Sequence, residues 1–265
     1  MKYAVITDVH ANLPALEAVL RDIEGRPSVQ ATYHLGDLVG YAPWPNETVA
    51  LLRSRGIAGV AGNYDSTTAS NYKHCGCKYE NPTQEALSHQ SFEWTKAHVS
   101  DETRRHLADL PFRIDLRPLG GHLAAGPRVV LVHGTPVVNT QYWTEDRPDA
   151  FCMQMAQQAG LKAGDAIAFG HTHQLWHHAI EGIHFVNCGT AGRPKDRDPR
   201  VSYALLDVQD TGGVTTEFVR VEYDVARTAR AIRESEPPDE FADFLETGGL
   251  VPWAAPLDAP SSEKP

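Results

Sequence analysis

Five short fragments of the sequence combine carboxylate, amide and imidazole side chains at spacings that suit metal binding. Together they supply seven candidate ligands: Asp8, His10, Asp37, Asn63, His133, His171 and His173. Mixed nitrogen and oxygen ligands of these types suit Mn²⁺, iron or Zn²⁺, whereas Ca²⁺ prefers oxygen alone. Seven side chains exceed the needs of one ion, and they suit two ions that share one carboxylate and hold a phosphoryl group. The pattern therefore predicts a two-metal centre.

Each fragment directly follows an apolar run of the kind that forms a buried β-strand. These expected strands cover residues 3–7, 31–35, 57–61, 129–132 and 166–169. Asn12 is expected to cap a helix, and further helices are expected at 46–54 and 148–160. In open α/β sheets, ligands bind beyond the carboxyl ends of the strands. We therefore expect the candidate ligands to converge at one edge of the sheets.

The middle and the end of the chain have a different pattern. Within 66–110, we expect a loop over Ser66–Tyr79 and helices at 82–97 and 101–110, which form an insertion over or beside the site. Later strands are expected at 112–116, over a hairpin at 175–187, and at 201–208 and 214–223, around a turn at 210–213. Residues 1–235 would form the domain, and 236–265 an acidic, proline-rich tail that is disordered over 255–265.

Composition excludes several classes of protein. The chain has 265 residues, 42% of them hydrophobic and 22% charged, and a formal net charge of −10. This charge argues against broad nucleic-acid binding, which needs a basic face. No apolar run approaches the ~20 residues of a membrane helix, and the first residues do not form a signal peptide. We expect a cytoplasmic protein that acts away from membranes, and the oligomeric state stays open.

The order D-x-H, G-D, G-N, H-G and G-H-x-H resembles the calcineurin-like metallophosphoesterase superfamily over residues 3–208. The resemblance implies an α/β fold, a four-layer αββα sandwich of two mixed sheets. It implies that Asp8, His10 and His173 hold a first metal. Asn63, His133 and His171 would hold a second, Asp37 would bridge both, and a bridging hydroxide would attack phosphorus. The segments Leu35–Glu47 and Asn187–Pro194 resemble bacterial members described as predicted phosphoesterases related to protein phosphatases and diadenosine tetraphosphatases.

The sequence departs from the family pattern at Tyr64. The family has histidine after G-N, commonly assigned to protonating the leaving group, and a partner acid that survives here as Asp65. A phenol has a reference pKa of ~10 and is a weaker acid than imidazolium. The rate of hydrolysis should therefore fall least for substrates with good leaving groups. The candidate catalytic residues are Asp37, Tyr64, Asp65 and His133, and the candidate substrate contacts are Asn63, Tyr64 and Arg193.

Three features away from the ligand set leave alternatives open. Arg193 is a candidate phosphate contact, because guanidinium suits phosphate oxygens, or else part of a solvated turn. The group His74, Cys75 and Cys77 is a small metal or redox site, or else a tight loop near the site, and a disulfide framework is not expected. The aromatic pair Tyr142 and Trp143, within a segment that reaches Arg147, would shape a substrate pocket or pin its loop to the core.

These residues predict a dinuclear phosphoesterase that uses Mn²⁺, iron or both, with Zn²⁺ as a further option. The expected substrate is a small phosphorylated molecule, nucleotide-like or another phosphoester, and the change at Tyr64 favours phosphodiesters. Phosphomonoesters, phosphoproteins and dinucleoside polyphosphates stay open. Two functions of other classes also stay open: a non-catalytic metal-binding scaffold with this fold, and a thiol-redox role for Cys75 and Cys77.

Overall fold

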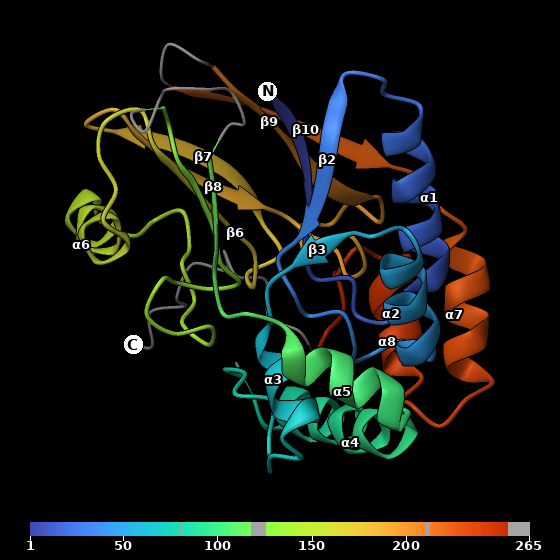
Figure 1. The fold of residues 1–265 in the computed structure, drawn as a ribbon. Helices are drawn as coiled ribbons and strands as arrows, with labels where there is room; N and C mark the ends of the chain where they lie inside the picture. The colour runs from blue at the N-terminus through green and yellow to red at the C-terminus, as the bar shows by residue number, and fades with distance from the viewer. Residues whose placement is uncertain (80, 118–125, 210–212, 254–265) are drawn as a thin grey trace.

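A computed structural model describes residues 1–79, 81–117, 126–209 and 213–253. In this part of the chain, eight helices accompany two five-stranded sheets (Figure 1). The first sheet has the order β10-β9-β1-β2-β3, and the second has the order β4-β5-β6-β8-β7. The strands are β1 Lys2–Ile6, β2 Val29–His34, β3 Ala58–Gly59, β4 Ile114–Leu116, β5 Val129–Leu131, β6 Ala166–Phe169, β7 Leu175–Ile180, β8 Ile183–Cys188, β9 Val201–Val208 and β10 Val214–Val221. The helices are α1 Leu13–Glu24, α2 Pro45–Ser54, α3 Asn63–Ala69, α4 Pro82–His98, α5 Asp101–Asp109, α6 Asp149–Ala159, α7 Val225–Arg233 and α8 Glu240–Glu246.

The two sheets pack face to face, with helices on their outer faces. Alternation along β1 shows the arrangement, because neighbouring side chains of a strand point to opposite faces. Tyr3 and Val5 belong to the core between the sheets, whereas Ala4 and Ile6 pack with α1. On the far side, Trp143 and α6 cover the second sheet. Figure 1 shows α6 on one side of the sheets and α1, α2 and α7 on the other. The predicted αββα sandwich is therefore confirmed.

Both sheets are mixed, and their parallel strands fix where the candidate ligands lie. In the first sheet, β1, β2 and β3 run parallel, β9 pairs antiparallel with β1, and β10 pairs antiparallel with β9. In the second sheet, β5, β6 and β8 run parallel, flanked by antiparallel β4 and β7. Five of these parallel strands lead directly into a candidate ligand, as the sequence predicted.

Two expectations about local structure need correction. Ser66–Ala69 is not loop, because α3 begins at Asn63. Serine and threonine are weak helix formers, which hid this helix in the sequence. Its stability comes from burial of Asn63, Tyr64, Asp65 and Thr68. The strands expected at 57–61 and 112–116 are shorter, at Ala58–Gly59 and Ile114–Leu116.

The segment after residue 235 carries a helix that the sequence interpretation did not anticipate. Helix α8 buries Phe241, Phe244 and Leu245, and it packs beside α7 with Arg233 bonded to Asp243 and Glu246. The part of the expected tail up to residue 253 therefore covers the domain. The disorder predicted at 255–265, and positions 210–212 of the expected turn, lie outside the described residues. No described helix is long and apolar enough to span a membrane.

Candidate metal centre

The loops that follow β1, β2, β5 and β6 are bonded to one another by their backbones. Asp8 N–H donates to Gly36 O at 3.0 Å, and His10 N–H donates to Asp37 O at 2.9 Å. In the second sheet, Gly170 N–H donates to the carbonyl of His133 at 2.8 Å. The side chain of Asp8 joins the two sheets, since its Oδ2 accepts from His171 N–H at 2.9 Å. These contacts bring ligands that are far apart in sequence into one cluster.

Six of the seven predicted ligands form two buried groups. Within each group, one ligand atom per residue lies within 4.8 Å of the others. We name Asp8, His10 and His173 the first triad, and Asp37, His133 and His171 the second triad. The seventh ligand adjoins the second triad, with Asn63 Oδ1 3.0 Å from His133 Nε2. Every predicted metal ligand is therefore placed at one centre.

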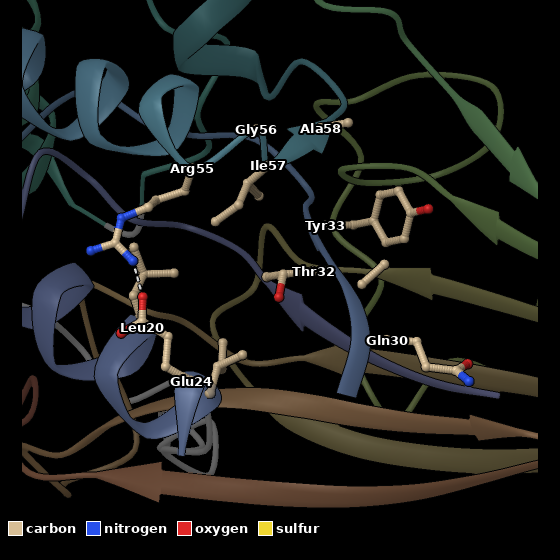
Figure 2. A pocket seen from close by; sticks show the side chains of 11 residues that line it. Leu20, Glu24, Gln30, Thr32, Tyr33, Arg55, Gly56, Ile57 and Ala58 are labelled. Carbon is tan, nitrogen blue, oxygen red and sulfur yellow. Dashed lines mark hydrogen bonds and ion pairs between the residues drawn. The ribbon is translucent and has the colours of Figure 1, made fainter. Parts of the chain in front are cut away.

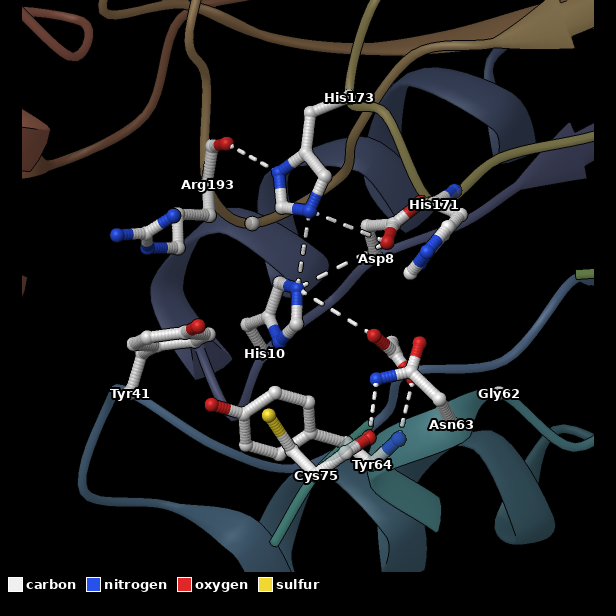
Figure 3. Close-up of polar contacts among 12 residues, drawn as sticks. Asp8, His10, Tyr41, Gly62, Asn63, Tyr64, Cys75, His171, His173 and Arg193 are labelled. Atoms are coloured by element: carbon white, nitrogen blue, oxygen red, sulfur yellow. Dashed lines mark hydrogen bonds and ion pairs between the residues drawn. The ribbon is translucent and has the colours of Figure 1, made fainter. Parts of the chain in front are cut away.

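The first triad presents two imidazole nitrogens to one carboxylate oxygen (Figure 3). His173 Nε2 lies 3.2 Å and His10 Nε2 3.7 Å from Asp8 Oδ1. The opposite nitrogen of each ring lies near a backbone carbonyl. His10 Nδ1 is 3.2 Å from Val39 O, and His173 Nδ1 is 2.6 Å from Arg193 O. A carbonyl accepts a hydrogen bond, so each ring carries its proton on Nδ1 and leaves the Nε2 lone pair free.

The second triad centres on His133 and Asp37. His133 Nε2 lies 3.4 Å from Asp37 Oδ2 and 3.2 Å from His171 Nδ1, while its Nδ1 lies 2.8 Å from Leu35 O. Asp37 Oδ2 is also 3.8 Å from His10 Nε2 of the first triad. The Asp37 carboxylate therefore stands between the two triads, where a shared ligand belongs.

Two orphaned atoms support metal binding at this centre. Asp8 Oδ1 and His171 Nε2 are buried and have no hydrogen-bond partner. In addition, His10 Nε2 and His173 Nε2 face each other at 3.2 Å, although both are acceptors in the tautomer set by the carbonyls. Buried polar atoms without partners are costly. A cation held by Asp8 Oδ1, His10 Nε2 and His173 Nε2 would remove that cost at the first triad, and the donor set suits Mn²⁺, iron or Zn²⁺.

Backbone conformation adds evidence that these loops serve ligand placement. Five ligands have a positive φ, which non-glycine residues rarely adopt: Asp8 (53°), His10 (49°), Asp37 (51°), His171 (67°) and His173 (63°). Each such residue costs on the order of 1–3 kcal/mol, and such residues gather at functional sites. A Cβ on Gly62 would lie 2.1 Å from Asp37 Oδ1, and one on Gly170 would lie 2.5 Å from Asp8 Oδ2. The glycines of the G-N and G-H motifs therefore let the loops approach these carboxylates.

Burial and neighbouring charge separate the pKa values of the histidines. Burial lowers the pKa of His10 well below its ordinary value, and it lowers those of His171 and His173 as well. Burial would also lower the pKa of His133, but the charge of Asp37 outweighs it and raises that pKa to about 9. Burial would raise the pKa of Asp8, but its interactions with the neighbouring histidines, His173 first, outweigh burial and hold that pKa well below its usual range. His133 is therefore the histidine of the centre whose charged form is favoured when no metal is bound.

Comparison with known proteins agrees with this geometry. The model of the protein family described as "Calcineurin-like phosphoesterase superfamily domain" matches residues 1–211. An uncharacterized protein of Methanocaldococcus jannaschii is 30% identical over 266 residues, which cover 92% of this chain and 97% of the relative. The crystal structure of a metallophosphoesterase from Sphaerobacter thermophilus is 28% identical with a TM-score of 0.70, and the match covers 94% of this chain and 99% of the other.

The chain belongs to the calcineurin-like phosphoesterase superfamily. The fold also matches a hypothetical protein of Pyrococcus horikoshii OT3, with a TM-score of 0.78 at 22% identity, covering 94% of this chain and 99% of the other. The resemblance read from the five motifs is therefore confirmed.

Tyr64 and Asp65, the two residues that follow Asn63, contact the loops that carry the predicted ligands. Asp65 accepts hydrogen bonds from Leu38 N–H at 2.8 Å and Gly62 N–H at 2.9 Å. Burial and then Asp37 raise the pKa of Asp65 to about 7. Tyr64 N–H donates to Asp37 Oδ1 at 2.8 Å, and its ring lies edge-on to His10 with a centroid distance of 5.5 Å. Figure 3 shows its hydroxyl on the side of Tyr41. The acid role of Tyr64 stays a prediction.

Arg193 is buried beside the first triad and does not lie in a solvated turn. Only 4% of this residue is exposed. Its guanidinium carbon lies 4.0 Å from the ring centre of Tyr41 and 3.9 Å from that of Phe244, and no carboxylate of the described residues pairs with it. A cavity of about 10 Å³, room for one water, is lined by residues that include Arg193, His10 and Phe241. The sequence analysis did not identify Tyr41 or Phe244 as site residues. No sequence pattern indicates the positive φ of Tyr41, 68°, and Phe244 lies in the segment that was expected to be a tail.

The loop after β5 divides its two aromatic residues between the core and the centre. Trp143 is fully buried and stacks on Phe169, with ring centroids 4.3 Å apart. Tyr142 instead lies over His171, with centroids 4.2 Å apart. Trp143 therefore pins this loop to the core, whereas a role of Tyr142 in a substrate pocket stays a prediction.

Residues 71–79, which we name the cysteine loop, cover the second triad. Cys75 and Cys77 form a disulfide, although no disulfide was expected from the sequence. The sequence analysis argued against disulfides from the expected cytoplasmic location. The fold nevertheless brings the two sulfurs together in a tight loop. Cys75 is fully buried, and its carbonyl accepts a hydrogen bond from Asn63 Nδ2 at 2.9 Å. The loop is thus tight and lies near the site, as one alternative expected, and it carries a disulfide, while a redox role for the two cysteines stays a prediction.

A larger hollow lies away from the metal centre. Its volume is about 460 Å³, and its walls come from α1, β2 and the turn before β3 (Figure 2). Arg55 and Glu24 form an ion pair at its mouth. None of the seven candidate ligands lines it. Size alone would therefore point to the wrong place on this molecule.

Proposed function

We propose that this chain is a dinuclear metal-dependent phosphoesterase with a preference for phosphodiesters. The observation that carries the proposal is the pair of buried triads, with Asp37 Oδ2 close to histidine nitrogens of both. A single structural ion would not need two such groups. A chain of 265 residues also has no need of metal to fold. The membership in the superfamily supports the same assignment.

The residues divide the work of holding metals and substrate. Asp8, His10 and His173 would hold the first metal, Asn63, His133 and His171 the second, and Asp37 both. Bound metals of this kind neutralise phosphoryl oxygens and lower the pKa of the attacking water. Asp37 and His133 are thereby catalytic through the metals they hold. The identity of the metals, Mn²⁺ and iron before Zn²⁺, is part of the proposal, and a cytoplasmic location stays a prediction.

Arg193 would bind a second anionic oxygen of the substrate. Its guanidinium is desolvated and held between two aromatic rings, which fixes its direction without neutralising its charge. Burial lowers the pKa of Arg193, and a guanidinium nevertheless stays charged in proteins. A phosphate oxygen would supply the hydrogen-bond acceptor that the described residues do not.

The preference for phosphodiesters rests on Tyr64. Burial raises the pKa of its hydroxyl well above 10, so it transfers a proton poorly at neutral pH. Esters whose leaving group needs little protonation should react best. Small nucleotide-like phosphodiesters fit this description, and phosphomonoesters and dinucleoside polyphosphates are the alternatives.

The test compares bis-(4-nitrophenyl) phosphate with 4-nitrophenyl phosphate after Mn²⁺ loading. We expect hydrolysis of both, faster for the diester. Asp37→Asn should lose metal and activity, whereas Asp109→Asn, an exposed carboxylate on α5, should keep both. Full activity and metal content in Asp37→Asn would overturn the metal assignment. A diester cleaved no better than the monoester would overturn only the preference. Negligible metal and no hydrolysis after loading would favour a scaffold.

A further inference from the structure

The cysteine loop holds the side chain of a predicted metal ligand. Asn63 Nδ2 donates to Cys75 O at 2.9 Å and lies 3.6 Å from Cys77 Sγ. An amide has one donor end and one acceptor end. With its donor end fixed by the loop, Asn63 turns Oδ1 toward His133 Nε2, 3.0 Å away. Figure 3 shows Cys75 directly beside Asn63 at this point. The loop therefore sets which end of the amide faces the second triad.

The disulfide closes the loop at the residues that make these contacts. Cys75 is fully buried among core residues that include Phe92 and Tyr64. Cys77 is only half-buried, so it is the cysteine of the pair that a reagent can approach more readily. A Cβ at Gly76, between them, would meet Thr140 at 2.7 Å. The loop is thus wedged against the segment that carries Tyr142, and both segments close over the centre.

We propose that the Cys75–Cys77 disulfide is a thiol–disulfide exchange site whose reduction by a small dithiol releases Asn63 and opens the second triad. The proposal concerns the loop itself, and only its metal-binding arm rests on the proposed function. Disulfides of proteins in reducing compartments are usually transient and redox-sensing. An outer contact that orients a metal ligand typically contributes about 10- to 100-fold in metal affinity. The disulfide therefore controls a ligand without being one.

The exchange reaction balances with a dithiol alone. A thiolate of the reagent attacks Sγ of Cys77, the less buried of the two cysteines, and the bond to Cys75 Sγ breaks. Tyr79 Oη lies 3.1 Å from Cys75 Sγ and donates a hydrogen bond to the sulfur that leaves. The second thiol of the reagent then displaces Cys77. Two protein thiols and one cyclic disulfide result, so the two protons and two electrons gained by the protein come from the dithiol.

The experiment begins with the number of free thiols. Oxidised protein should show the two thiols of Cys152 and Cys188 after denaturation. Protein treated with dithiothreitol and then desalted without air should show all four cysteines. Nuclear magnetic resonance of the metal-free protein then follows the side-chain amide of Asn63, assigned by its loss in Asn63→Asp. We expect hydrogen exchange at this amide to be at least tenfold faster in the reduced protein. Equal exchange in both states would overturn the proposal.

Metal binding provides the second readout. Calorimetry should show that reduction weakens one Mn²⁺ site about 10- to 100-fold and leaves the other unchanged. Cys77→Ser should behave like the reduced protein under both conditions, whereas Cys152→Ser, a buried thiol on α6, should keep the full redox response. Identical affinities in both redox states would overturn the control of Asn63. If neither state binds Mn²⁺, the proposed function fails, and the amide exchange still decides whether the loop responds.

Discussion

The two triads of the metal centre share their ligand types but differ in what holds them. The first triad lies on the loops after β1 and β6, and backbone carbonyls set the tautomer of its two rings. The second triad depends on Asn63 at the start of α3, and Asn63 depends on the cysteine loop. The pKa of His133 in the second triad is raised, whereas those of His10 and His173 in the first are lowered. Loops at strand ends thus hold both triads, and the second triad also has the contact of Asn63 with the cysteine loop and a histidine that favours its charged form.

Replacing one proposed ligand of each metal is the strongest way to test this comparison, with His173 taken from the first triad and Asn63 from beside the second triad. His173→Gln should empty the first triad, and Asn63→Ala should empty the second. Each variant should keep about one Mn²⁺, because the remaining triad retains its own ligands, and activity should fall to that of metal-free protein. Metal analysis together with diester hydrolysis checks both results. Loss of both ions from either single variant would mean that the triads are one cooperative site.

The pH dependence of metal binding should distinguish the triads next most clearly. A metal needs neutral imidazole, and the pKa of His133 is raised to about 9. Below pH 9 a metal must displace this proton, so affinity at the second triad should rise about tenfold per pH unit between pH 7 and 9. The first triad should change little, since the pKa values of His10 and His173 are lowered. Calorimetric titrations at pH 7, 8 and 9 should show the two sites diverge, and parallel curves would refute the difference.

Arg193 lies beside the first triad but should act on substrate alone. Arg193→Met should raise KM for a phosphodiester about 10- to 100-fold, since hydrogen bonds to charged groups contribute roughly 1.5–3 kcal/mol. The metal content should not change. Arg200→Met, whose side chain is 48% exposed, is the matched control and should resemble the wild type. An unchanged KM in Arg193→Met would remove Arg193 from the substrate site.

The stability of the metal-free protein should show the smallest effect. The raised pKa of His133 stabilises the folded chain fully below pH 6.5, and this contribution is lost as pH rises through 9. The free energy of unfolding should therefore fall by at most about 1 kcal/mol per pH unit in this window. His10, His171 and His173 are neutral in both states above about pH 7.5, since their folded pKa values are lowered and unfolded histidine has a pKa of ~6.5, so the slope is measured between pH 7.5 and 9. Urea unfolding of wild type and His133→Gln tests this, and an equal slope in both proteins would assign the effect elsewhere.

The ligands were predictable from sequence because each motif follows an apolar strand. The carboxyl ends of neighbouring parallel strands lie at the same edge of a sheet, so the ligands converge there. Asp8 and His133 are 125 positions apart in the chain, yet both positions could be read from local patterns. The αββα architecture followed from the same strands together with the family resemblance. These features depend on periodicity and motif spacing, which a sequence displays directly.

The covering segments could not be predicted in the same way, because tertiary packing determines them. Helix α3 is rich in serine and threonine, and burial of Tyr64 and Asp65 overrides their weak helix propensity. Helix α8 follows a proline-rich stretch. Its contribution to the site is Phe244, whose ring packs on the guanidinium of Arg193. The contact between Asn63 and Cys75 joins residues whose pairing no periodic pattern encodes.

The most direct test of the two-triad centre is anomalous X-ray diffraction from crystals of the Mn²⁺-loaded protein. The geometry of the ligands predicts two anomalous peaks, one within Asp8, His10 and His173 and one within His133, His171 and Asn63, with Asp37 in contact with both. A single peak, or peaks away from these side chains, would contradict the assignment of a dinuclear centre.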